Sequence, residues 1–151
     1  MEVPLIAALA PDDLQACAGK GTYILVLHLP EAVSLRVGRL GTFALAAGWY
    51  AYVGSAFGSG GLRGRLRHHL TPAPRPHWHI DYLRHAAQLV EIWYTASDTP
   101  YEHAWAAALR ALPGASVPIA RFGASDCRCA AHLFSFPTRP TLAAFQPAEK
   151  T

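Results

Sequence analysis

The sequence predicts an α/β (α+β) domain in which a central, mainly antiparallel sheet is flanked by helices. The first observation behind this prediction is an aromatic, strand-like run at 49–56 that ends in a glycine-rich turn before a basic helix at 60–70. The second is that further strand-like segments lie on both sides of this unit. The third is composition, because 52% hydrophobic and 15% charged residues among 151 are sufficient for one core.

The N-terminal third is expected to contain one strand and one hairpin. Residues 1–18 are interpreted as a short lead-in that offers one helical turn. A strand is expected at 19–28, where glycines precede an apolar run that carries Tyr23. Alternating residues over 34–45, interrupted by glycines, predict a hairpin. This hairpin separates Tyr23 from Tyr52.

The basic helix at 60–70 is expected to bring a cation and an imidazole toward the end of the preceding strand. Its apolar residues are spaced as an amphipathic helix requires, at Leu62, Leu66 and Leu70. Arg65 and His69 are also four residues apart, so they share one face of the helix. We therefore expect Tyr52, Arg65 and His69 to converge.

The second half of the chain is expected to add two helices and two strands. Prolines at 72–76 end the basic helix, and Trp78, Tyr82 and Leu83 indicate a second helix. A buried strand is expected at 88–95. Thr99 is the expected N-cap and Pro100 the first residue of a third helix, which runs through 112 and stops at Pro113.

A single domain is expected over 19–136, closed by a short strand at 133–136. The proline-rich tail at 137–151 is expected to be flexible.

The formal net charge of +3 and a predominance of arginine among the 13 positive residues permit nucleic-acid binding. The sequence has no apolar run long enough for a membrane span and no signal-peptide pattern, which predicts a cytoplasmic protein. Its three cysteines argue against a disulfide framework.

Several short motifs resemble those of the GIY-YIG nuclease superfamily. Gly-Thr-Tyr ends at Tyr23, Tyr-Val-Gly begins at Tyr52, and Arg65 precedes His69 by four residues. Within the superfamily, the sequence is most similar to a small stand-alone branch of unknown function. The features that resemble this branch are Gly-Arg-Leu-Gly-Thr-Phe at 38–43, Tyr-Ala-Tyr-Val-Gly-Ser-Ala at 50–56, His-Trp-His-Ile-Asp-Tyr-Leu at 77–83 and Ser-Asp-Cys-Arg-Cys at 125–129.

The resemblance covers roughly residues 19–136 and implies the superfamily's fold. Because the superfamily joins its two motif strands more tightly, the inserted hairpin predicts a sheet extended beyond three strands. Thr22 stands where the superfamily usually has isoleucine. Ser125 and Asp126 lie near the place where the superfamily often has asparagine, and that role stays unassigned here.

The resemblance also implies a metal-dependent endonuclease that hydrolyses phosphodiester bonds in DNA, with repair or recombination as the expected setting and RNA left open as a substrate. Arg65 is then expected to neutralise charge on the scissile phosphate, with His69 beside it. Tyr23 is expected to act as the general base, and Tyr52 to position water or phosphate. A free phenol is a poor base at neutral pH, so Arg65 or the metal would have to lower its pKa.

Glu102 is the expected ligand of Mg²⁺ or Mn²⁺, because a hard cation requires a carboxylate. The superfamily carries its metal-binding glutamate on the corresponding helix. The alternative is that Glu102 only complements the helix dipole. Arg63 and Arg67 are expected to follow the nucleic-acid backbone, or else to form a solvated helix face. Gly54 is a turn residue that would also let a phosphate approach.

Three histidines and two cysteines allow further chemistry. His77 and His79 flank Trp78, and proton transfer and structural hydrogen bonding are both open for them. Cys127, Cys129 and His132 have the close spacing of zinc ligands but lack a clear fourth partner, so a pair of free thiols is the alternative. Two further functions therefore stay open: a non-catalytic nucleic-acid-binding module and a zinc-stabilised interaction domain. The sequence leaves the oligomeric state undetermined.

Overall fold

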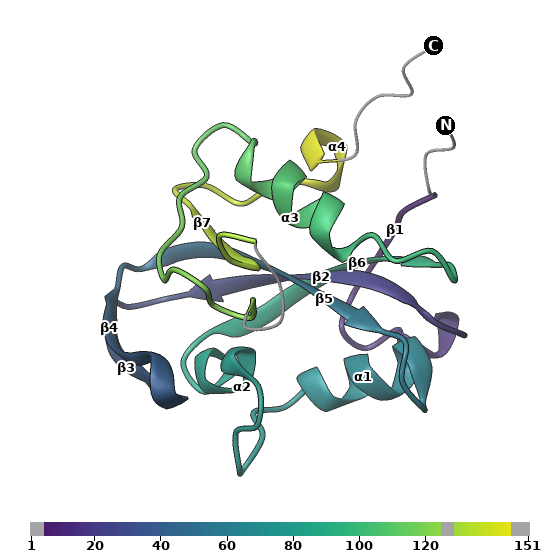
Figure 1. Ribbon diagram of the computed structural model, residues 1–151, viewed down its shortest axis with the longest axis horizontal. Coiled ribbons are helices and arrows are strands. Elements are labelled where there is room, and N and C mark those ends of the chain that lie inside the picture. Colours follow the sequence, from purple (N-terminus) through teal and green to yellow (C-terminus); the bar gives the residue numbers. More distant parts are fainter. Residues whose placement is uncertain (1–4, 125–128, 146–151) are drawn as a thin grey trace.

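A computed structural model describes residues 5–124 and 129–145 of the chain. Its centre is a five-stranded, entirely antiparallel sheet in the order β1-β6-β2-β5-β7 (Figure 1). The strands are β1 (Ala7–Leu9), β2 (Gly21–Leu29), β5 (Gly48–Ala56), β6 (Gln88–Ala96) and β7 (Leu133–Phe136). The fold class predicted from the sequence is therefore confirmed.

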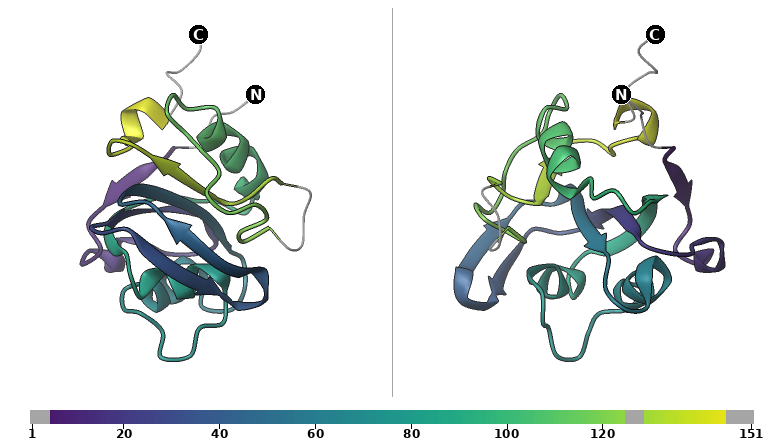
Figure 2. Two further views of the ribbon diagram at one scale, coloured as in Figure 1. Left: turned by 90° about the vertical axis from the view of Figure 1, so that its left-hand side faces the viewer. Right: turned by 45° about the vertical axis from the view of Figure 1, so that its right-hand side comes forward.

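Helices cover both faces of the sheet (Figures 1 and 2). On one face lie α1 (Gly61–His69) and α2 (His79–Arg84), and on the other lie α3 (Glu102–Arg110) and α4 (Leu142–Phe145). The central strands β2 and β5 are buried on both faces, so the side chains of each alternate between two apolar clusters. Burial on both sides explains why these strands have nearly continuous apolar sequences.

The expected hairpin forms, as β3 (Val33–Val37) and β4 (Gly41–Leu45), with a 3₁₀ turn at Gly38–Leu40 between them. It is a separate two-stranded sheet and not an addition to the central one. The expectation of a sheet with more than three strands is correct, but β1 and β7 supply the additional strands at its edges.

Two segments that were expected to be peripheral are packed against the sheet. Within the lead-in, β1 pairs with β6, so residues 7–9 are an edge strand. Within the tail, Phe145 of α4 is buried and its ring lies 5.5 Å from that of Trp93 and 5.6 Å from that of Trp105. The prediction of a flexible tail is therefore wrong for 142–145, because Phe145 completes the second apolar cluster.

The third helix begins later than predicted. Its N-cap is Tyr101, not Thr99, and Glu102 is its first residue. The backbone N–H of Tyr101 donates to the hydroxyl of Thr22 on β2, at 3.1 Å. This bond fixes the start of α3 over the sheet and sets the position of Glu102. Among the residues described, no helix has the length and apolar character needed to cross a membrane.

Candidate functional site

Tyr23 and Gly54 face each other across β2 and β5. A Cβ atom added to Gly54 would lie 2.5 Å from the Tyr23 hydroxyl oxygen, closer than such atoms approach. Gly54 is itself buried. Its lack of a side chain therefore makes room for the phenol of Tyr23, and the expectation that Gly54 presents open backbone to a phosphate is not met.

The Tyr23 hydroxyl contacts Nε2 of His69, in the last turn of α1, at 2.8 Å. His69 is 1% exposed. Burial and the neighbouring His68 lower the pKa of His69 to about 3, so its imidazole is neutral at physiological pH. A neutral imidazole can exchange a proton with the phenol across this contact.

Tyr23 and Tyr52 are both neutral at physiological pH. Burial raises the pKa of Tyr23 well above its ordinary value, and the nearby Arg65 offsets this only in part. Burial raises the pKa of Tyr52 as well, and Tyr23 and Glu102 raise it further. Arg65 alone therefore does not bring the pKa of Tyr23 below that of a free phenol, as the expected role of Tyr23 as a general base would require.

Arg65 is held between a backbone carbonyl and an aromatic ring. Its Nη1 donates to the carbonyl oxygen of Ser55 at 2.9 Å, and its guanidinium carbon lies 4.3 Å from the centre of the Trp78 ring. Stacking on an indole face fixes the plane of a guanidinium. The role of Trp78 was missed from the sequence, where it was read only as an apolar position of the second helix.

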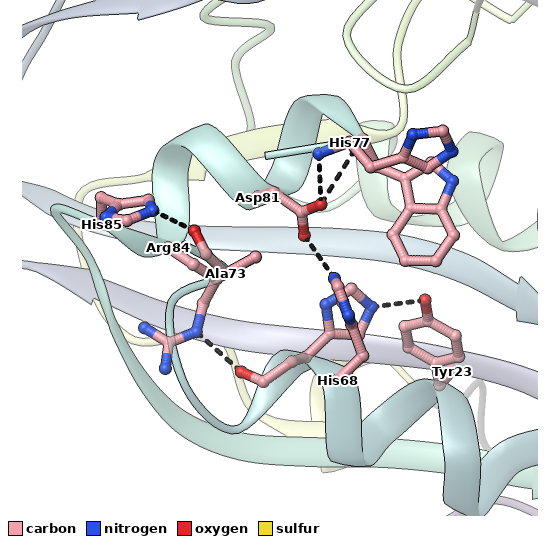
Figure 3. A network of polar contacts seen from close by, with 9 residues as sticks. Tyr23, His68, Ala73, His77, Asp81, Arg84 and His85 are labelled. Carbon is pink, nitrogen blue, oxygen red and sulfur yellow. Dashed lines mark hydrogen bonds and ion pairs between the residues drawn. The ribbon is translucent and has the colours of Figure 1, made fainter. Parts of the chain in front are cut away.

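The His-Trp-His segment is held by Asp81, which lies within α2 and is 2% exposed. Its carboxylate accepts the backbone N–H groups of His77 and Trp78 at 2.9 and 3.0 Å, and contacts Nε2 of His68 at 2.9 Å (Figure 3). Burial works against ionisation of Asp81, yet these hydrogen bonds keep the pKa of its carboxyl below the ordinary value. Asp81 thus fixes the segment that carries Trp78.

The two histidines beside Trp78 have different surroundings. His79 accepts the backbone N–H of Gly123 at its Nδ1, at 2.7 Å, and its ring packs against Phe122. Of the two roles left open for His79, this hydrogen bond corresponds to the structural one. Burial lowers the pKa of its imidazole. The His77 side chain is exposed, and the bond that holds this residue runs through its backbone.

The C-terminal end of α1 is fixed by the buried Arg84 of α2. Its guanidinium donates to the carbonyl oxygens of His69 at 2.9 Å, Leu70 at 2.9 Å and Ala87 at 2.6 Å. A cation bonded to the last carbonyls of a helix also complements the helix dipole. Arg84 therefore holds His69 in place through the backbone.

Glu102 reaches the same site from the opposite face of the sheet. Its Oε1 accepts the hydroxyl of Ser55 at 2.6 Å, and its Oε2 lies 3.2 Å from Nδ1 of His132. Burial works against its ionisation, but the contacts with His132 and Ser55 keep the pKa of Glu102 below its ordinary value. Its side chain is 26% exposed, so the ionised carboxylate is accessible to a cation from solvent.

Ser55 is therefore the point at which both faces meet. Its carbonyl oxygen binds Arg65 of α1, and its hydroxyl binds Glu102 of α3. Ser55 was not singled out from the sequence, although it directly follows the Tyr-Val-Gly motif. Together with the Tyr23–His69 pair, these groups bring a cation, a carboxylate and a proton-exchanging pair to one end of β5.

A second group of potential ligands lies beside Glu102. Single ligand atoms of His103, Cys129 and His132 are all within 4.8 Å of one another. The sequence predicted Cys129 and His132 for a zinc site, but it missed His103. Cys127, together with Ser125 and Asp126, lies outside the described residues. A similar group on the α1–α2 side consists of His68, His69 and Asp81.

The remaining basic residues of α1 point outward. Arg63 and Arg67 are exposed and lie four residues apart on one helix face. Arg63 donates to the carbonyl oxygen of Gln15 at 3.0 Å, whereas the side chain of Arg67 makes no hydrogen bond or ion pair within the part of the chain described. Their exposure is compatible with both open alternatives, a backbone-binding face or a solvated one.

Comparison with known proteins places the chain in a family. A search of curated proteins and a search of solved structures each find no match. A family model described as "Domain of unknown function DUF123" matches residues 22–149, a range that includes every candidate site residue from Tyr23 to His132. Because that match covers most of the sequence, the chain belongs to the family described as Domain of unknown function DUF123.

Proposed function

We propose that the protein is a divalent-metal-dependent endonuclease of the GIY-YIG type that hydrolyses phosphodiester bonds in DNA. The observation that carries this proposal is the meeting of Arg65 and Glu102 at Ser55. Phosphodiester hydrolysis needs positive charge on the non-bridging oxygens and a path for the proton of the attacking water. Arg65 supplies a fixed cation, and the Tyr23–His69 pair supplies a proton path beside it.

The residues present fit a hard divalent cation at Glu102. Its carboxylate is ionised, partly exposed and held in place by Ser55. Mg²⁺ commonly binds through one or two carboxylates and keeps several waters, so a single glutamate is an adequate anchor. When bound, the ion would supply Lewis-acid stabilisation of charge on the phosphate.

The other residues act through position and proton exchange. Arg65 pairs with a non-bridging oxygen in a plane set by Trp78. Tyr23 and neutral His69 form a hydrogen-bonded path for the proton of the attacking water, and the negative phosphate would have to stabilise the imidazolium that forms, because the protein alone lowers the pKa of His69 to about 3. Tyr52, whose ring centre lies 6.4 Å from that of His69, positions the water or phosphate.

The test is a cleavage assay on branched, nicked and linear DNA with Mg²⁺ or Mn²⁺. Glu102→Gln keeps the size of the side chain but removes the charge that a hard cation requires, so the rate should fall on the order of 10³-fold or more, equivalent to several kcal/mol. Glu91→Gln is the matched control, because Glu91 lies on β6 and is paired with Arg139, whereas Glu102 contacts Ser55 and His132. Cleavage by Glu102→Gln at the wild-type rate, with unchanged metal dependence, would refute the proposal.

A non-catalytic nucleic-acid-binding module is the alternative, and one observation favours it. Both carboxylate oxygens of Glu102 already have protein partners, Ser55 and His132. Wild-type protein that binds DNA in a salt-dependent way but cleaves none of the substrates with either metal would support this alternative.

A further inference from the structure

The group formed by His103, Cys129 and His132 differs chemically from the site around Ser55. It offers two imidazole nitrogens and one sulfur, and these are the ligands of zinc, not of magnesium. A tetrahedral zinc ion with such ligands needs ligand atoms roughly 3.3–3.8 Å apart. The three ligand atoms already lie within 4.8 Å of one another, so side-chain adjustment of about 1 Å would close the site.

The backbone that carries these ligands is fixed by neighbouring segments. The N–H of His132 donates to the carbonyl oxygen of Phe122 at 2.7 Å, and its carbonyl oxygen accepts the N–H of Val53 at 2.9 Å. Arg121 holds Cys129 and the residue after it, through its Nη1 to the carbonyl oxygen of Cys129 and its backbone N–H to that of Ala130. His103 follows Glu102 in the first turn of α3. The ligands therefore converge from two independently anchored elements.

His132 has the surroundings typical of a metal-binding imidazole. Its Nδ1 lies 3.2 Å from Oε2 of Glu102, and its side chain is 3% exposed. Histidines that bind a metal through one ring nitrogen usually direct the other ring nitrogen toward a carboxylate, which fixes the ring and its tautomer. With Nδ1 facing Glu102, a metal bound to His132 would be held by Nε2.

A cavity of about 420 Å³ lies next to this group. His103, Cys129 and Arg110 are among the residues that line it. A zinc ion held by three protein ligands retains one open coordination position. Because His103 and Cys129 line the cavity, water or an anion beside Arg110 would have access to that position.

We propose that His103, Cys129 and His132 form a zinc site, with His132 binding through Nε2 and Glu102 orienting it. The ion joins the start of α3 to the segment that precedes β7. Its three ligands are neither the magnesium ligand nor groups that touch the phosphate, so His103→Ala and Cys129→Ser test the zinc site without altering the magnesium ligand. It also gives Glu102 a second task, as the carboxylate partner of His132.

The first test measures the zinc content of protein purified without chelator. About one zinc per chain is expected. His103→Ala, a replacement of an exposed side chain, and Cys129→Ser should each lose most of the metal, while folding is checked by circular dichroism. Cys17→Ala and His68→Ala are the matched controls: the first removes a buried thiol from the apolar cluster that α1 and α2 cover, and the second removes a histidine from the other ligand group.

The second test measures affinity and coordination. Wild-type protein stripped with chelator and titrated with Co²⁺ should develop the absorption bands of a tetrahedral site, including a thiolate-to-metal band that Cys129→Ser removes. Glu102→Gln should weaken zinc binding by about 10- to 100-fold, the usual effect of losing the carboxylate partner of a metal-binding histidine. Absence of zinc, or zinc retained in full by His103→Ala and Cys129→Ser, would overturn the proposal. Neither result depends on DNA cleavage, so this proposal and the nuclease proposal can fail separately.

Discussion

The two sides of the sheet contribute different kinds of polar group to the site around Ser55. On the α1–α2 side, His69, Asp81 and Arg84 are each less than a tenth exposed. Asp81 and Arg84 bind backbone groups, and His69 contacts the hydroxyl of Tyr23. On the α3 side, Glu102 is partly exposed and His103 is exposed. These three buried groups are closed to solvent, whereas Glu102 and His103 are open to it.

This difference separates positioning from binding. Buried polar groups that are bonded to backbone fix geometry, because any movement leaves a donor or acceptor without a partner. Asp81 and Arg84 therefore hold Trp78 and His69, which in turn hold Arg65 and Tyr23. Exposed carboxylate and imidazole groups can instead exchange water for a cation, which is what the α3 side offers.

The largest effect that could break this division is that of Tyr23→Phe. If Tyr23 takes part in the chemistry, deleting its hydroxyl should lower the cleavage rate on the order of 10²–10⁴-fold. The change also leaves Nε2 of His69 buried without its partner, which should cost about 1–3 kcal/mol in the free energy of unfolding. Rates under single-turnover conditions and urea unfolding measure the two effects separately.

Tyr50→Phe is the control for this change. Tyr50 lies on the same face of the sheet, is buried, and donates its hydroxyl to the carbonyl oxygen of Ala46 at 2.6 Å, away from Ser55. It should lose stability but keep the rate. If Tyr23→Phe likewise loses stability but keeps the cleavage rate, the groups on the α1–α2 side only position the site and take no part in the chemistry.

The next effect concerns the stability of the fold in acid. It tests whether the buried His69 on the α1–α2 side is shielded from protons in solvent. The pKa of His69 falls from an ordinary 6.5 to about 3 on folding, so between these values the unfolded chain binds a proton that the folded chain does not. The contribution of His69 is therefore fully present above pH 6.5 and is lost as pH falls toward 3. The free energy of unfolding should decrease by up to about 1.4 kcal/mol per pH unit within this window.

His69→Gln should remove this part of the slope between pH 6.5 and 4. Asp81→Asn serves as the comparison, because the pKa of Asp81 is lowered from 3.8 and its contribution is lost only as pH falls through that lower folded value. Asp81→Asn should therefore be less stable throughout but keep the slope between pH 6.5 and 4. An unchanged slope in His69→Gln would show that this imidazole is accessible to protons.

Local patterns in the sequence were sufficient for most of the fold. Glycine, proline and apolar spacing marked β2, β5, β6 and the three main helices because these signals are contained within each segment. The edge strand β1 shows the limit of such signals. β1 has only three residues, and its place beside β6 depends on contacts with residues 92–94, far along the chain. Nothing within the segment specifies such a partner.

The candidate site likewise contains features that a local sequence pattern predicts and contacts that no local pattern contains. The shared face of Arg65 and His69 follows from helical spacing alone, and the structure confirms that both reach the Tyr23–Ser55 region. The contact between Ser55 and Glu102 spans 47 residues and two layers, so no local pattern contains it. Trp78 and His103 were missed for the same reason, since their roles depend on neighbours from other elements.

The smallest effect concerns the outer face of α1, which is exposed although it belongs to the closed side. If Arg67 contacts a phosphate, Arg67→Ala should lower the slope of log affinity against log salt concentration by about one. Arg63→Ala should have the same or a smaller effect, because Arg63 already donates to the carbonyl oxygen of Gln15.

Arg36→Ala on β3 is the matched control, since it removes an equal charge from an exposed position outside α1. Fluorescence anisotropy with labelled DNA at several salt concentrations measures these slopes. Equal losses for Arg67→Ala and Arg36→Ala would mean that only net charge attracts DNA, and the proposed binding face on α1 would be wrong.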